Sequence, residues 1–284
     1  MTAPPVHHWQ TSRFRLELTR PLVMGIVNAT PDSFSDGEST DFVRSAIERC
    51  GRLAEEGADL LDLGGESTRP GALTPDPEVE WERVEPVLAH ALTLGIPVSV
   101  DTSEPLVMRR ALEMGADVIN DVRALRRPGA LAVVAAFPSA GVCLMHLRGE
   151  PATMQQLAAY DDVVSEVREE LAARLRDAVA AGVSLDRIVL DPGIGFAKSA
   201  EHNWMLLQRQ AELLLLGRPL LVGWSRKGTL GRLTGRPVHE RQSASVAAAL
   251  ACVQRGASIV RVHDVAATVD ALAVWRAAGL PGGH

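Results

Sequence analysis

Cysteine and positive charge are both scarce in this sequence of 284 residues. Its three cysteines, Cys50, Cys143 and Cys252, are odd in number and far apart, so they indicate neither a disulfide framework nor a zinc site. The net charge of −6 differs from the basic balance that is usual in nucleic-acid binders. No apolar run is long enough to span a bilayer, and the N-terminal segment lacks the apolar core of a signal peptide. We therefore expect a soluble, cytoplasmic protein whose partners are neither nucleic acids nor membranes.

Aromatic residues make up only 4% of the chain, and Ala, Leu and Val supply most of its apolar content. Eight short apolar runs alternate with longer segments of helical periodicity. The runs cover Leu22–Val27, Leu60–Leu63, Val98–Val100, Val118–Ile119, Val142–Met145, Ile188–Leu190, Leu220–Val222 and Ile259–Val262. The helical segments cover Asp41–Glu56, Val79–Thr93, Leu106–Met114, a short fourth around Pro128–Ala136, Val163–Ala181, Trp204–Leu216, His239–Arg255 and Ala266–Ala278.

Glycines stand where most of these helical segments would end, as a left-handed terminal residue requires. They are Gly57, Gly95, Gly115, Gly182, Gly217, Gly256 and Gly279. Continuous apolar strands joined by helices imply a parallel sheet covered on both faces, and eight such units in about 260 residues match a closed barrel. An open doubly wound sheet is the alternative, but no GxGxxG motif follows the first strand.

We therefore expect an α/β protein with a single (β/α)₈ TIM-barrel domain over residues 21–284. Residues 1–20 form an N-terminal extension in this prediction. Polar and apolar residues alternate over residues 8–20, which favours a short hairpin that covers the bottom of the barrel.

A group that can bind or ionise stands at the C-terminal end of every apolar run. These groups are Asn28, Asp62, Asp101, Asn120 with Asp121, His146, Asp191, Arg226 with Lys227, and Arg261 with His263. Active sites of (β/α)₈ barrels form at this end of the strands. A barrel without a site would scatter a few such residues there as helix caps, so polar residues at all eight ends favour a functional site.

Eight segments around these run ends carry a family resemblance. They are MGIVNATPDSFSDG (Met24–Gly37), DLGGESTRPGA (Asp62–Ala72), PVSVDT (Pro97–Thr102), GADVINDV (Gly115–Val122), MHLRGEPATMQ (Met145–Gln155), DPGIGFAK (Asp191–Lys198), GWSRKG (Gly223–Gly228) and RVHDV (Arg261–Val265). In order and spacing the set resembles the dihydropteroate synthases. Any one segment would be weak evidence, but together they are highly specific.

The resemblance implies a transferase of folate biosynthesis. It would condense 6-hydroxymethyl-7,8-dihydropterin diphosphate with p-aminobenzoate and release 7,8-dihydropteroate and pyrophosphate. The resemblance also implies Mg²⁺ as cofactor, competition by sulfonamides, and a homodimer, for which the Ala-rich last helices are the expected interface.

The pterin presents adjacent N–H donors, which a carboxylate accepts as a bidentate pair. Asp191 resembles this anchor, and Lys227 would reach the acceptors of the ring. The resemblance assigns the rest of the pterin site to Asp62, Asp101, Asn120, Met145 and Phe196.

Each of these polar residues also has a purely structural interpretation. Asp191-Pro-Gly alone is more often a turn, Asp101-Thr-Ser reads equally well as a helix N-cap, and a buried Asn120 could satisfy backbone groups. Their convergence on one face of the barrel favours the site.

For the diphosphate, the resemblance points to Arg261 and His263, which lie two residues apart and so face the same way on a strand. The resemblance implies that Asn28 is the position that contacts magnesium, and Thr68 and Arg69 resemble further contacts to the substrates. Asp101 and Asp36 would stabilise positive charge on the methylene. Arg69 could equally be a loop arginine that faces solvent.

One position departs from the family pattern. A hydroxyl residue commonly follows Ser225-Arg226-Lys227 and is thought to hold the aminobenzoate carboxylate, but here the position is Gly228. Thr229 could supply a hydroxyl instead. No nucleophile signature is present, and we expect Cys143 to belong to the core rather than to catalysis.

Two other functions remain open at this level. A methyltetrahydrofolate–corrinoid methyltransferase would keep the Asp and Asn floor but would not need Arg261 and His263 as a diphosphate clamp. A non-catalytic pterin-binding paralogue should have lost residues of the clamp or loops, and only Gly228 is unusual here.

Overall fold

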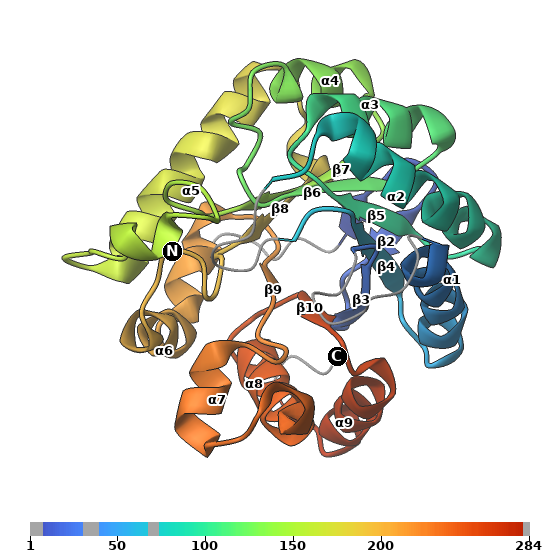
Figure 1. Ribbon diagram of the computed structural model, residues 1–284. Helices are drawn as coiled ribbons and strands as arrows, with labels where there is room; N and C mark the ends of the chain where they lie inside the picture. Colours follow the sequence, from blue (N-terminus) through green and yellow to red (C-terminus); the bar gives the residue numbers. More distant parts are fainter. Residues whose placement is uncertain (1–7, 31–39, 68–73, 281–284) are drawn as a thin grey trace.

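Eight parallel strands form the centre of the protein, and helices surround them (Figure 1). This computed structural model describes residues 8–30, 40–67 and 74–280. The strand order is β8-β7-β6-β5-β4-β3-β10-β9, and a parallel bridge between Leu190 and Leu220 joins the two edges. The expected (β/α)₈ barrel is confirmed.

The strands of the barrel coincide with the eight apolar runs to within two residues. They are β3 (Leu22–Asn28), β4 (Leu60–Gly64), β5 (Val98–Asp101), β6 (Val118–Asp121), β7 (Gly141–Met145), β8 (Ile188–Asp191), β9 (Leu221–Val222) and β10 (Ile259–Val262). The α-helices are α1 (Thr40–Glu55), α2 (Pro77–Ala91), α3 (Pro105–Met114), α4 (Ala130–Ala136), α5 (Val163–Ala180), α6 (Ala200–Gln208), α7 (Gly228–Thr234), α8 (Gln242–Gln254) and α9 (Val265–Ala277).

Five 3₁₀ segments complete the described elements. They are η1 (Leu92–Leu94), η2 (Met154–Leu157), η3 (Leu185–Arg187), η4 (Gln210–Leu216) and η5 (Val238–Glu240). The seven glycines that were expected to end helices all have positive φ, between +65° and +114°. These glycines therefore adopt the left-handed conformation that the sequence predicted for the ends of the helical segments.

Alternate residues of each strand face opposite sides of the barrel wall. Leu22 and Met24 of β3 pack in the interior, whereas Val23 and Val27 pack against the surrounding helices. The interior cluster takes one or two residues from nearly every strand: Leu22, Met24, Leu60, Val118, Cys143, Val189, Leu221 and Ile259. Buried apolar residues on both faces of the sheet explain why the strands read as continuous apolar runs.

An antiparallel hairpin closes the N-terminal end of the barrel, as expected. Its strands are β1 (His8–Gln10) and β2 (Arg15–Glu17). Trp9 is fully buried and belongs to the interior cluster, together with residues of the barrel strands such as Leu22 and Leu60. Its indole N–H donates to the carbonyl of Arg187 at 2.7 Å, so burying the ring leaves no donor unpaired.

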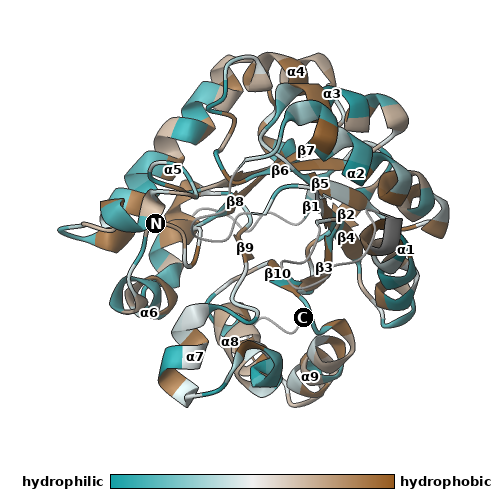
Figure 2. Cartoon of the chain, viewed as in Figure 1, coloured by the Kyte–Doolittle hydropathy of each residue, from teal (hydrophilic) through white to brown (hydrophobic). Residues whose placement is uncertain are grey.

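Polar residues concentrate on the outer side of the helix ring, and the strands inside it are largely apolar (Figure 2). Helix α9 is pale or brown over most of its length, unlike α1 and α2. Among the described helices, none combines the length and the apolar character that crossing a bilayer requires.

Two helical expectations were wrong in detail. The segment Trp204–Leu216 is not one helix, because α6 ends at Gln208 and η4 follows. Buried Gln210 donates to the carbonyls of Cys252 and Arg255, and these contacts hold the chain in the tighter turn. Helix α7 was not expected, since its two glycines, Gly228 and Gly231, lower helix propensity.

We expect Trp9→Ala to lower the free energy of unfolding by about 3–5 kcal/mol, because it removes a buried ring and leaves a cavity at the bottom of the barrel. Urea denaturation followed by circular dichroism measures the change. Arg15→Ala in the same hairpin is the matched control, since Arg15 is exposed, and its effect should stay within about 0.5 kcal/mol. Equal losses in both variants would contradict this role of Trp9.

Candidate active site

The inward-facing series of each strand continues from the apolar interior to a polar mouth. Val118, Val189 and Ile259 face the interior, and two residues further along the same strands come Asn120, Asp191 and Arg261. Asp62 follows interior Leu60, and Met145 follows interior Cys143, in the same phase. The side chains that the sequence assigned to pterin binding are thereby brought to one end of one barrel.

Arg261 is the centre of this polar floor. Its Nε donates to Oδ2 of Asp62 at 2.5 Å, and its Nη2 donates to Oδ2 of Asp101 at 2.9 Å. The amide of Asn120 donates to the same Oδ2 of Asp62 at 3.0 Å. Three strands, β10, β4 and β5, therefore meet through one guanidinium, and β6 joins them through Asp62.

Two acceptors of this floor lack a partner. Oδ1 of Asp62 and Oδ1 of Asn120 are buried and accept no hydrogen bond from the described residues. A buried acceptor without a donor costs about 1–3 kcal/mol. A ligand that brings N–H groups would remove this cost, so the floor is suited to such a ligand.

Burial shifts the pKa values of the floor toward neutrality. It raises the pKa of Asp191 to about 6, although the N–H of Gly193 and the charge of Lys227 oppose the rise. Burial likewise raises the pKa of Asp101, against the opposing charge of Arg261. It lowers the pKa of Lys227 to about 8, and the charge of Arg261 acts in the same direction. Near pH 7, Asp191 is mainly a carboxylate and Lys227 mainly an ammonium group.

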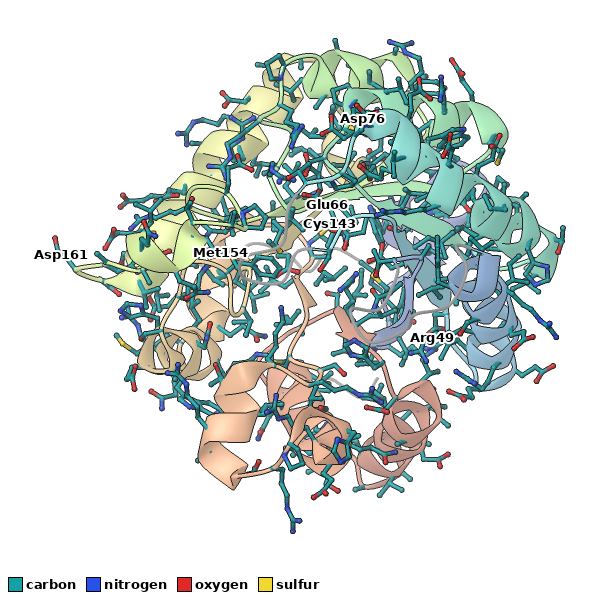
Figure 3. All side chains as sticks on the ribbon, viewed as in Figure 1. Arg49, Glu66, Asp76, Cys143, Met154 and Asp161 are labelled. Atoms are coloured by element: carbon teal, nitrogen blue, oxygen red, sulfur yellow. The ribbon has the colours of Figure 1, made fainter. Side chains whose placement is uncertain are left out.

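An apolar shelf borders the floor on the side of β6, β7 and β8. It consists of Val122, Met145, Leu147, Met154, Phe196 and Ala197, all buried. Lys227 Nζ lies 4.3 Å from the centre of the Phe196 ring, within the range of a cation–π contact. Figure 3 shows Met154 between α5 and the centre of the barrel. A flat ring could lie against this shelf with its polar edge on the floor.

His263 is oriented by Ser225, which the sequence reasoning left without a role. The Ser225 hydroxyl accepts from the backbone N–H of His263 at 3.1 Å, and it lies 2.9 Å from Nδ1. The Ser225 hydroxyl can donate its proton to Nδ1, and a neutral ring in this tautomer carries its proton on Nε2. Burial, followed by the charges of Arg261 and Arg226, lowers the pKa of His263 to about 3. In the ligand-free protein His263 is thus a neutral hydrogen-bond donor and not a cation.

Two further arginines surround His263. Arg49 of α1 donates to the carbonyls of Ile26 and His263 at 2.7 and 2.8 Å, and so joins the ends of β3 and β10. Arg226 pairs with Asp264 at 2.5 Å. Arg49 lies in a helical segment that otherwise looks amphipathic, so the sequence carries no signal for this contact.

Arg123 links three loops at the mouth. It binds both carboxylate oxygens of Glu66, at 3.0 and 3.1 Å, and its Nε donates to Glu150 at 2.7 Å. In the view of Figure 3, Glu66 lies towards the centre of the barrel. Cys143 itself is fully buried in the interior, and burial raises the pKa of its thiol, which confirms it as a core residue.

Some polar run ends do not face the mouth. Asp121 accepts from the backbone N–H groups of Arg123 and Leu125, and His146 turns outward to Glu170 of α5. Each of these residues comes directly after a residue that faces the barrel interior, so its own side chain points to the opposite side. The inward-facing residue at the end of β7 is therefore the apolar Met145. The expectation that all eight strand ends carry a site residue was therefore too broad.

The outer positions of the predicted site are less fully described. Asn28 ends β3 and is exposed. Asp36, Thr68 and Arg69 lie outside the described residues. A Cβ at Gly228 would meet no heavy atom within 4 Å apart from its own chain neighbours and helix backbone, so tertiary packing does not require glycine there. The hydroxyl of Thr229 accepts from Asn203 at 2.9 Å inside the protein, which argues against its replacing the missing hydroxyl.

A family model described as "Pterin binding enzyme" matches residues 24–263. Dihydropteroate synthase of Neisseria meningitidis serogroup B is 51% identical over 280 residues, which cover 96% of this chain and 98% of the relative. The chain belongs to the dihydropteroate synthase family.

Solved structures of this family superpose on nearly the whole chain. Dihydropteroate synthase of Xanthomonas albilineans with 4-aminobenzoic acid has a TM-score of 0.90 and 50% identity, covering 96% of this chain and 98% of that one. The Burkholderia cenocepacia enzyme complexed with 7,8-dihydropteroate has a TM-score of 0.86 and 47% identity, with 98% of both chains covered. The Yersinia pestis enzyme in a sulfonamide drug complex has a TM-score of 0.90 and 42% identity, covering 96% and 99%.

Membership in the dihydropteroate synthase family makes this chain a transferase. The corrinoid methyltransferase alternative is disfavoured, because eight curated relatives at 44–51% identity are each named dihydropteroate synthase. Methyl transfer also releases no diphosphate, so it would not need Arg261 and His263 as a diphosphate clamp.

We expect Arg261→Met to destabilise the protein by about 3 kcal/mol at pH 8 and by less at pH 5, because it leaves the carboxylates of Asp62 and Asp101 facing each other without their cation. Folding raises the pKa of Asp101. The stability that this group contributes is therefore fully present below its pKa in the unfolded chain, and it is lost as the pH rises through its pKa in the folded protein. Urea unfolding at the two pH values measures the difference. Arg261→Lys keeps the charge and should lose less, and a pH-independent loss in Arg261→Met would refute the charge argument.

Proposed function

We propose that this chain condenses 6-hydroxymethyl-7,8-dihydropterin diphosphate with p-aminobenzoate to give 7,8-dihydropteroate and pyrophosphate. The observation that carries the proposal is the floor around Arg261, where two buried acceptors lack donors beside a group of cations. A pterin edge supplies the donors, and a diphosphate suits the cations. The bound 4-aminobenzoic acid and 7,8-dihydropteroate of the Xanthomonas and Burkholderia relatives support both substrates.

In this proposal Asp191 accepts the adjacent N–H groups of the pterin, and Lys227 donates to its ring acceptors. Asn120, Asp101 and Asp62 complete the floor under the ring. The apolar faces of the ring pack on Met145 and Phe196 of the shelf. The ligand-free pKa values support these roles, because Asp191 and Lys227 carry opposite charges near pH 7.

Arg261 and His263 bind the diphosphate. Arg261 retains one exposed edge, with 21% of its side chain accessible, although it is paired to two carboxylates. His263 offers Nε2–H, because Ser225 occupies its Nδ1. A bound diphosphate would raise the pKa of His263, since a nearby negative charge favours the imidazolium form. Thr68 and Arg69 are proposed as further contacts to the substrates.

In the reaction the arylamine nitrogen bonds to the exocyclic methylene, and the bond from that carbon to the diphosphate oxygen breaks. The bonding pair leaves with pyrophosphate, and the new amine loses one proton. Arg261 and His263 face the negative charge that grows on the leaving oxygen. Asp101 is proposed to stabilise the positive charge on the methylene, together with Asp36. An arylamine is neutral near pH 7, so no strong base is needed.

We also propose Mg²⁺ as the cofactor, with Asn28 as a protein ligand. The described residues contain no group of three or more His, Cys, Asp or Glu able to hold a metal. An exposed carboxamide at the mouth still fits Mg²⁺, which commonly takes one or two protein ligands together with substrate phosphates. The ion would supply positive charge to the leaving diphosphate.

A homodimer through α7, α8 and α9 is part of the proposal. Leu233 and Val274 are 68% and 69% exposed, and Val238 between α7 and α8 is 54% exposed. Their exposure supports an apolar contact face. Sedimentation equilibrium at micromolar concentration should give twice the chain mass, and Leu233→Glu with Val274→Glu should give a monomer. A monomeric wild-type protein would refute the dimer.

A cytoplasmic location is proposed as well. Its support is the free, buried state of Cys50, Cys143 and Cys252, which a reducing compartment preserves.

The deciding experiment mixes the protein with both substrates and Mg²⁺ and measures pyrophosphate release. We expect turnover that needs both substrates, falls at least a hundredfold in Arg261→Ala and is inhibited competitively by a sulfonamide against p-aminobenzoate. The sulfonamide complex of the Yersinia relative motivates the last part. Pterin binding without pyrophosphate release would identify a non-catalytic paralogue and overturn the proposal.

Pterin affinity should weaken about tenfold as the pH falls from 7 to 5, because Asp191 with a pKa near 6 becomes protonated and loses its role as a double acceptor. Fluorescence titration with an oxidised pterin measures this dependence. Asp191→Asn should bind weakly with no such pH dependence, whereas Asp101→Asn should retain it. A full pH dependence in Asp191→Asn would remove Asp191 as the anchor.

A further inference from the structure

The loop that joins β8 to α6 has an unusual backbone. Gly193, Gly195 and Ala197 all have positive φ, at +67°, +83° and +49°. A left-handed alanine is strained, so other contacts must stabilise this conformation. The loop begins at Asp191 and includes Phe196, so it carries one polar and one apolar member of the candidate site.

Lys198 supplies these contacts from within the loop. Its Nζ donates to the carbonyls of Gly193 and Phe196 at 3.0 and 2.9 Å, and it lies 2.8 Å from Nδ1 of His146. These three partners use all three protons of an ammonium group. Only 3% of Lys198 is exposed, and no carboxylate of the described residues forms an ion pair with it. Carbonyls and an imidazole therefore solvate the ammonium form as they would a bound cation, although burial lowers the pKa of Lys198 to about 7.

His146 is held in the state that this arrangement requires. Its Nε2 lies 3.0 Å from Oε2 of Glu170, so Nε2 carries the ring proton and Nδ1 can accept from Lys198. Burial, followed by the charge of Lys198, lowers the pKa of His146 to about 4, which keeps the ring neutral. Arg148 binds the other oxygen of Glu170 through two nitrogens, at 2.8 and 2.5 Å, and fixes the carboxylate.

The loop is also locked from its other sides. A Cβ at Gly193 would lie 2.0 Å from the carbonyl oxygen of His146, so the backbone approaches too closely for any other residue. The Tyr160 hydroxyl donates to the carbonyl of the left-handed Ala197 at 3.0 Å. Through Phe196, the same loop contacts Lys227 of the floor.

We propose that Lys198 is a positioning residue that acts as an internal cation, and that it shapes the β8–α6 loop so that Asp191 and Phe196 are presented to the pterin. The inference rests on the proposed function for the identity of the ligand. Lys198 is not itself a catalytic residue, because its protons are directed at the loop and at His146. Its charge, and not its bulk, organises the loop.

Lys198→Met tests the charge, because methionine fills similar space without it. We expect pterin affinity to fall at least tenfold in fluorescence titration, while the KM for p-aminobenzoate at saturating pterin stays within twofold. Hydrogen exchange of a peptide covering residues 192–199 should accelerate in the ligand-free variant. Wild-type pterin affinity and wild-type exchange in Lys198→Met would overturn the proposal.

Lys198→Ala allows the charge to be returned separately from the bulk. Addition of n-propylammonium should restore pterin binding and slow exchange of residues 192–199, whereas 1-propanol of nearly the same shape should not. Equal rescue by both compounds would show that packing is sufficient and would refute the internal cation.

A matched pair at His146 tests the third contact. His146→Asn can place a carboxamide oxygen where Nδ1 accepts, whereas His146→Gln reaches Glu170 but leaves no acceptor for Lys198. We expect the asparagine variant to bind pterin more tightly than the glutamine variant, and the reverse order would contradict the proposal. Hydrogen exchange in the ligand-free protein reports on the loop even if the wild-type protein released no pyrophosphate, so this inference and the proposed function can fail independently.

Discussion

Side chains two residues apart on a strand point to the same side, and in this barrel that alternation connects the apolar interior directly to the polar mouth. Val118 leads to Asn120, and Ile259 leads to Arg261. The packing that closes the barrel therefore also determines where the site residues point. A residue out of this phase, such as His146, faces the helices even though it lies at a strand end.

The polar mouth is stable without a ligand because its charges are arranged around Arg261. Two carboxylates share this guanidinium, and the neutral His263 adds a donor without adding a further cation. The cost of this arrangement is visible in the unpaired acceptors of Asp62 and Asn120 and in the shifted pKa of Asp191. Groups that are incompletely satisfied in this way before a ligand arrives are typical of functional sites.

The order of strands and helices could be predicted because each element depends on local pattern. Apolar runs coincide with the strands, and glycines that must adopt positive φ end the helices. The prediction failed where long-range contacts override local preference. Gln210 bonds to the end of α8 and breaks a helical segment, and the glycine-containing α7 forms where propensity predicts none. The hairpin was predicted from alternation alone, and its burial through Trp9 explains why it folds under the barrel.

The sequence by itself determined the barrel, the family and the residues that stand at the strand ends, because periodicity and motif spacing are properties of the chain. Only the tertiary structure decided which of those residues meet, since direction and distance depend on how distant strands are aligned. It joined Arg261 to Asp62 and Asp101, and it oriented His263 through Ser225. It also turned His146 away from the mouth and directed the ammonium group of Lys198 at the carbonyls of its own loop. Contacts between residues far apart in the chain leave no local pattern, and these contacts define the site.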